Sequence, residues 1–103
     1  MEFSEIQKLV YSEYKKNGFE EEFNKHDAIG DIAELGLITT EISEAIETIR
    51  YSNTRKHLCF ELADIVIRVL NFANRKGINL EFFIQQKNDI NQQRNKFHGN
   101  KNI

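Results

Sequence analysis

The chain has 103 residues, with 14 Lys and Arg residues against 16 Asp and Glu residues, and 40% of its residues are hydrophobic. This length fits one domain over residues 1–103, because two independent cores would need a longer chain. The near-balanced charge disfavours a nucleic-acid-binding protein, which is usually basic. One cysteine, an acidic start without signal-peptide features and no apolar run of about 20 residues predict a cytoplasmic protein that does not cross a membrane.

Apolar residues recur at helical spacing along nearly the whole chain, and the sustained alternation typical of a strand is missing. The first helix is expected over residues 3–17, with Asn17-Gly18 as its stop. A loop should follow. Asp27 is then expected to cap a long second helix that reaches about residue 51 and carries a stripe of isoleucines on one face.

Two further helices complete the predicted fold. The third is expected over residues 55–76 and should end at Gly77. Apolar residues cover most of its circumference, so we expect it to be packed on several sides. The fourth is expected over residues 80–97, with Asn79 as its cap. The predicted fold class is therefore an all-α, four-helix-type bundle. Because so short a chain buries only a modest core, we also expect self-association through the helices.

Two acidic pairs carry the first functional signal. Glu41 and Glu44 lie on the second predicted helix, and Glu61 and Asp64 lie on the third. Residues three apart share one helix face, and a short connection makes consecutive helices antiparallel neighbours, so both pairs can face one groove. Without a cation, four like charges there would raise one another's pKa values. Carboxylates suit Mg²⁺, with Mn²⁺ as a substitute. The alternative for Glu41 and Glu44 is a solvated helix face, and the alternative for Glu61 and Asp64 is a salt bridge to an arginine of the third helix.

The fourth predicted helix carries a complementary row of polar residues. Lys87, Asn91, Arg94 and His98 are spaced by four, three and four, which places them on one stripe, and Lys101 extends the set from the tail. Cationic and amide donors in a row suit phosphate oxygens. An ordinary polar helix exterior is the alternative. If the row binds phosphates, the active site lies between the second, third and fourth helices.

These segments together resemble the MazG-type nucleotide pyrophosphohydrolases of the all-α NTP pyrophosphatase superfamily. The resemblance extends over about residues 30–101. Three segments carry it, in this order along the chain: Glu41-Ile-Ser-Glu44, the run from Glu61 to Asn71, and the row from Lys87 to His98-Gly99.

The resemblance implies Mg²⁺-dependent hydrolysis of (deoxy)nucleoside triphosphates to the monophosphate and pyrophosphate, as house-cleaning of the nucleotide pool by a homodimer or homotetramer. Glu41 or Glu44 would take the proton of the attacking water. The implied metal ligands are Glu41, Glu44, Glu61 and Asp64, and the implied substrate-binding residues are Lys87, Asn91, Arg94, Lys101 and Asn71, where the family often has an acid. Two alternatives stay open: a phosphoribosyl-ATP pyrophosphohydrolase, and a helical interaction module without catalysis.

Overall fold

The structure is a computed structural model that describes residues 1–52 and 54–98, with side chains described at positions 1–51 and 54–94. These residues form helices and no strand, so the all-α prediction is confirmed. None of the helices described is long and apolar enough to cross a membrane. In chain order the helices are α1 (Phe3–Lys16), α2 (Phe19–Asn24), α3 (Asp27–Glu47), the π-helical turn η1 (Thr48–Ser52), α4 (Arg55–Arg75) and α5 (Leu80–His98).

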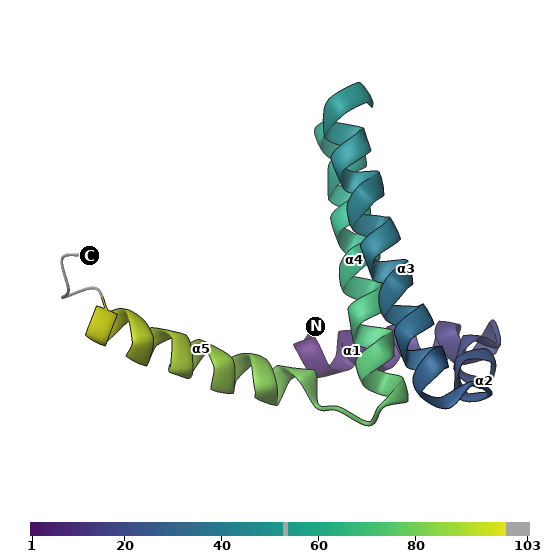
Figure 1. Cartoon of the computed structure of the whole chain (residues 1–103), viewed down its shortest axis with the longest axis horizontal. Coiled ribbons are helices and arrows are strands. Elements are labelled where there is room, and N and C mark those ends of the chain that lie inside the picture. Colours follow the sequence, from purple (N-terminus) through teal and green to yellow (C-terminus); the bar gives the residue numbers. More distant parts are fainter. Residues whose placement is uncertain (53, 99–103) are drawn as a thin grey trace.

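The long helices α3 and α4 form an antiparallel hairpin that stands upright in Figure 1. Helix α1 crosses the base of the hairpin against α4, and the short α2 packs there against α3. Helix α5 leaves this base in another direction and runs away from the hairpin (Figure 1). Within one chain, α5 therefore does not lie beside α3 and α4 as a fourth bundle helix.

The turn between α4 and α5 follows its predicted chemistry. Gly77 has a φ of 69°, and the Ile78 N–H donates to the carbonyl of Ala73 at 2.8 Å, which is a Schellman ending for α4. Two residues later the Asn79 side chain accepts a hydrogen bond from the Phe82 N–H at 3.2 Å and caps α5. Both predicted helix signals are confirmed: α4 ends at Gly77 and α5 is capped by Asn79.

The N-terminal third differs from the sequence prediction in two places. The segment that was expected to be a loop contains the helix α2. Asp27 was expected to cap the next helix, but it is the first residue of α3, and His26 takes the cap position. The backbone of Asp27 has a φ of 48°. Helix α2 crosses α3 very closely: a Cβ added at Gly30 would collide with the carbonyl oxygen of Phe23. A glycine is required there for the two helices to approach.

A pair of amides fixes α1 across α4. The Gln7 side-chain amide donates to Asn74 Oδ1 at 3.0 Å and to the Ile78 carbonyl at 3.1 Å. Asn74 Nδ2 returns a hydrogen bond to the Gln7 carbonyl at 2.8 Å. Since Gln7 is buried, these bonds are shielded from water and hold α1 in one register over the base of α4.

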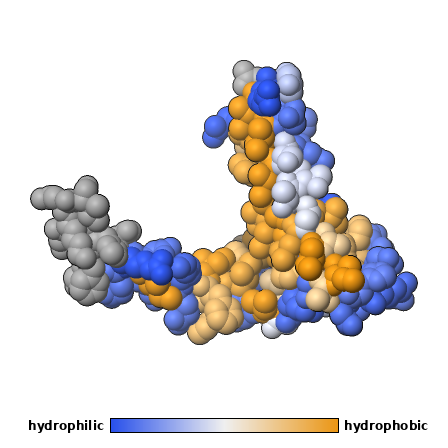
Figure 2. All heavy atoms as spheres, viewed as in Figure 1, coloured by the Kyte–Doolittle hydropathy of each residue, from blue (hydrophilic) through white to orange (hydrophobic). Residues whose placement is uncertain are grey.

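The hydrophobic core of the single chain is small. The buried hydrophobic residues among those described are Tyr14, Ala45, Leu70 and Ala73. On α4, the predicted packing on several sides is not found within one chain, because Val66 remains 51% exposed. Figure 2 shows apolar residues along the hairpin and over the first part of α5. Much of the apolar surface that the sequence provides is therefore left uncovered.

Candidate functional site

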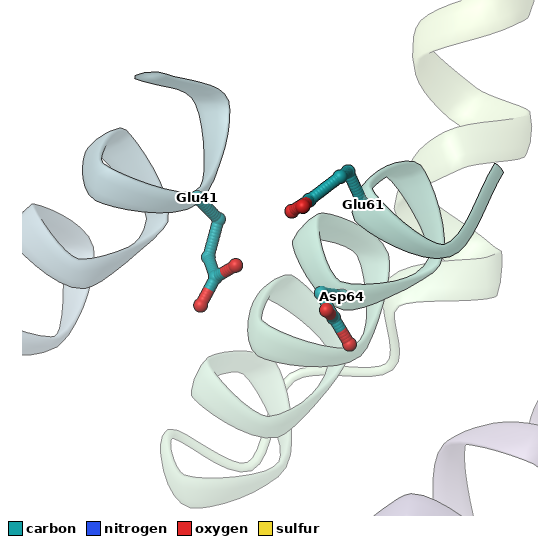
Figure 3. Close-up of side chains that lie close together, drawn as sticks. All are labelled: Glu41, Glu61 and Asp64. Atoms are coloured by element: carbon teal, nitrogen blue, oxygen red, sulfur yellow. The ribbon is translucent and has the colours of Figure 1, made fainter. Parts of the chain in front are cut away.

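Three of the predicted acids meet between the two helices of the hairpin. Glu41 comes from α3, and Glu61 and Asp64 come from α4 at a spacing of three. One carboxylate oxygen from each residue lies within 4.8 Å of the other two. Figure 3 shows the Glu41 and Glu61 side chains extending into the space between the helices, with Asp64 one turn further along α4. The antiparallel hairpin thus brings together side chains that are far apart in sequence.

Two of these acids have basic neighbours. Arg68 Nε donates to Glu41 Oε1 at 2.8 Å, and His57 Nε2 lies 3.2 Å from Glu61 Oε1. The side chains of Glu41 and Glu61 are only 13% and 12% exposed. Shielded carboxylates need such compensation, because leaving water is costly for an unpaired charge. The salt bridge to an arginine that was the alternative for Glu61 and Asp64 forms at Glu41 instead. Asp64 has no arginine or lysine partner among the described residues.

Glu44, the fourth predicted acid, lies at the edge of this group. It is not one of the three residues whose oxygens converge. Repulsion by Glu41 raises the pKa of its carboxyl above the usual range, with smaller upward contributions from desolvation and from Glu61. Glu44 therefore shares the electrostatic field of the cluster and holds its proton more tightly than an ordinary glutamate.

The donor set fits a hard divalent cation. All three converging atoms are carboxylate oxygens, which Mg²⁺ prefers. Ligands on one octahedral Mg²⁺ lie about 3 to 4 Å apart, so oxygens spread over as much as 4.8 Å need only small side-chain rotations to meet one ion.

A cavity of about 470 Å³ opens beside the acids, between α1, the start of α2, α3 and α4. Glu41, Asp64 and Arg68 line one part of it. Tyr14, Phe19 and Ile67 supply aromatic and aliphatic surface elsewhere in its wall. This volume is in the range of small-molecule sites, which are mostly apolar with a few polar groups.

The cavity also contains a buried ionic group that the sequence analysis missed. Glu34 lines the cavity, and its side chain is 4% exposed. Its carboxylate accepts a hydrogen bond from the Tyr14 hydroxyl at 2.6 Å and another from Arg75 Nε at 2.8 Å. Glu34 lies seven residues before Glu41, so both share one face of α3, and this spacing was the available signal.

The remaining predicted substrate residues divide into two groups. Asn71 is buried and lines the cavity, one turn beyond Arg68 on α4. Lys87, Asn91 and Arg94 are exposed on α5, which stands away from the hairpin, and they do not line the cavity (Figure 1). Lys101 lies outside the described residues.

The helices and the acids define an all-helical protein with a candidate divalent-cation site beside a ligand-sized cavity. A family model described as the MazG nucleotide pyrophosphohydrolase domain matches residues 31–97, which is more than half of the chain, and the chain belongs to this family. This membership supports nucleotide pyrophosphohydrolase activity in general, and proteins of the family are typically metal-dependent. The search of curated proteins and the search of solved structures found no match.

Proposed function

We propose that this protein hydrolyses (deoxy)nucleoside triphosphates to the monophosphate and pyrophosphate with Mg²⁺ as its cofactor, as part of nucleotide-pool house-cleaning. The observation that carries the proposal is the convergence of Glu41, Glu61 and Asp64 at a cavity that can accept a nucleoside. A polyphosphate needs a cation to neutralise it, and carboxylates that hold a cation beside a ligand-sized cavity meet that need.

A divalent ion bound by these acids would polarise the phosphates and lower the pKa of a bound water. Glu44 lies outside the converging group, so its carboxylate is not committed to the metal and could accept the proton of the water that attacks the α-phosphorus. The raised pKa of Glu44 suits a base, because a more basic carboxylate takes a proton more readily. Glu41 is the other candidate for this role.

We further propose that the protein self-associates as a homodimer or homotetramer and that the phosphate-binding row acts across subunits. Lys87, Asn91 and Arg94 are exposed on a helix that stands away from the acids of its own chain. Cations in a row are suited to phosphate oxygens. If α5 lies against the hairpin of a second copy, its cations can bind the pyrophosphate end of the substrate while its apolar residues cover exposed surface.

Substitution of the acids tests the proposal. Glu61→Gln and Asp64→Asn keep the size of each side chain and remove its charge, so each should lower Mg²⁺-dependent hydrolysis by about 100-fold or more. Rates are measured on purified protein with a panel of deoxynucleoside triphosphates, and helix content is checked by circular dichroism.

Glu47→Gln is the matched control, because Glu47 is an exposed acid of α3 outside the converging group. It should hydrolyse triphosphates at the rate of the unmodified protein. Full activity in Glu61→Gln and Asp64→Asn would rule out a metal role for these carboxylates.

A further inference from the structure

The wall of the cavity contains two buried polar side chains in addition to the proposed metal ligands. Taken as whole residues, Glu34 is 3% exposed and Asn71 is 6% exposed, and both line the cavity. Asn71 lies one helical turn before Arg75, the residue that binds the Glu34 carboxylate. Buried polar groups that face a ligand cavity fix the orientation and identity of the ligand, because any of them left unpaired is costly.

The surroundings of Glu34 keep it an acceptor of hydrogen bonds. The Arg75 side chain is 2% exposed and also binds Asp31 and Asn24. Burial lowers the pKa of Arg75, but its hydrogen bonds to Glu34 and Asp31 outweigh burial and leave that pKa raised, so the guanidinium stays charged.

The tyrosine on the other side acts in the same direction. Burial and the hydrogen bond to Glu34 raise the pKa of Tyr14, so the hydroxyl keeps its proton and donates a hydrogen bond to Glu34. Both neighbours of the carboxylate are therefore donors. An ionised carboxylate offers only lone pairs, and two oxygens have more of these than the two donors use.

Asn71 presents the opposite polarity. Its Oδ1 accepts a hydrogen bond from Asn74 Nδ2 at 3.3 Å. Its Nδ2 has no acceptor among the described residues, and it can donate to a ligand in the cavity. The cavity therefore combines one acceptor from α3 with one donor from α4, while Phe19 and Ile67 supply apolar surface for the faces of a planar ring.

We propose that Glu34 and Asn71 select nucleobases that carry an exocyclic amino group beside a ring-nitrogen acceptor, as cytosine and adenine do, over uracil and hypoxanthine. This inference rests on the proposed function, since it assigns the base-binding part of the same site. The amino group donates to Glu34, and the ring nitrogen accepts from Asn71. A keto oxygen in place of the amino group faces the carboxylate with no hydrogen between the two acceptors, so the two oxygens repel each other and the bond that the amino group makes is lost.

Two matched pairs of ligands test the selection directly. The pairs dCMP and dUMP, and dAMP and dIMP, each differ by the exchange of the amino group for a keto oxygen. We expect the amino member to bind at least about tenfold more tightly in one or both pairs, measured by calorimetry on the whole chain without Mg²⁺. If the keto member binds as well or better in both pairs, or if neither pair binds, the proposal is overturned.

This binding measurement separates the inference from the proposed function, because it needs no hydrolysis. If the amino preference is present and no triphosphate is hydrolysed with Mg²⁺, the base assignment stands and the proposed activity is wrong. If triphosphates are hydrolysed with no discrimination within the matched pairs, the activity stands and the base assignment is wrong.

Variants separate base selection from structural support. Glu34→Gln replaces one acceptor oxygen by a donor. In this variant the amino and keto members of each pair should bind with about equal affinity. Asp31→Asn is the matched control, because Asp31 binds the same arginine but does not line the cavity, so this variant should keep the preference. If Glu34→Gln does not fold, Asn71→Ala removes the donor and should weaken amino-base binding. Unchanged preference in the folded variants at both positions would overturn the proposal.

Discussion

At the scale of single residues, two acids of the candidate metal site are paired with basic side chains: Glu41 with Arg68, and Glu61 with His57. Glu41 is bound by Arg68, which also lines the cavity. A divalent cation bound by the Glu41 carboxylate would compete with this ion pair, so metal binding should free the guanidinium, which lines the cavity and can then bind a phosphate. Arg68 would therefore exchange its partner from Glu41 to a phosphate when a cation binds.

The ion pairs of Asp31 give a residue-scale prediction about pH. The Asp31 carboxylate accepts hydrogen bonds from Lys76 and Arg75, and these partners hold its pKa below the usual range. A lowered folded-state pKa adds stability above the unfolded value of about 3.9, and this stability is lost as pH falls through the folded value. Asp31→Asn should therefore lower Tm at pH 7, and the difference should shrink as pH falls below about 4.

Thermal unfolding followed by circular dichroism at both pH values checks this prediction. Asp89→Asn on α5 is the control, because Asp89 is exposed and makes no ion pair among the described residues, and its Tm should match that of the unmodified protein. A Tm difference for Asp31→Asn that is equal at the two pH values would contradict the account.

At the scale of elements, helix periodicity and turn chemistry were sufficient to predict the long helices. Gly77 and Asn79 carry local signals that tertiary packing did not override. The helix α2 was missed because it has only six residues, half of them acidic, and its one apolar pair, Phe19 and Phe23, is too short a pattern to indicate a helix. The position of α2 depends on the close contact between Phe23 and Gly30 of α3. The local spacing of apolar residues does not indicate a contact between two helices.

The candidate site was predictable only in part. Acids three apart indicated two faces, and the short connection between α3 and α4 made their meeting a direct consequence. The buried pair of Glu34 and Arg75 joins α3 to α4, as Glu41 and Arg68 do, and the spacing of seven between Glu34 and Glu41 was its available signal. The hydrogen bond from Tyr14 to Glu34 could not be derived, because it depends on how α1 closes over the hairpin. The direction of α5 could not be derived either, since the short connection between α4 and α5 permits many orientations of the second helix.

The row on α5 gives an element-scale prediction. If Arg94 acts on the site of a second copy, Arg94→Ala and Asp64→Asn should each be about 100-fold less active alone. Mixed after subunit exchange, they should regain about a quarter of the original activity, because half of the dimers are mixed and one site in each is intact. Hydrolysis rates before and after mixing provide the measurement. No recovery despite demonstrated subunit exchange would place Arg94 at the site of its own chain or outside the site.

At the scale of the whole molecule, the apolar surface is the dominant feature. Ile46 on α3 and Val66 on α4 are each 51% exposed, and Phe83 on α5 is 55% exposed. Large contiguous apolar surface on a protein usually marks an interface. The chain thus has more hydrophobic residues than its own fold covers, and this is the physical reason to expect a second copy.

Val66→Glu tests this expectation. A charge on the apolar face should prevent association, so we expect the unmodified protein to sediment as a dimer or larger species and the variant as a monomer without activity. Helix content should persist, because Val66 is already half exposed in the single chain. Lys8→Glu, at an exposed position on α1, should leave the sedimentation unchanged. A monomeric and fully active unmodified protein would contradict the expected assembly.

The most direct test of the central claim identifies the products of hydrolysis. The whole chain is incubated with Mg²⁺ and each deoxynucleoside triphosphate in turn, and the products are separated by ion-exchange chromatography. The proposed site predicts the nucleoside monophosphate and pyrophosphate in equal amounts, and neither product when the metal is chelated. Release of the diphosphate with free phosphate, or no turnover of any triphosphate with Mg²⁺ or Mn²⁺, would contradict it.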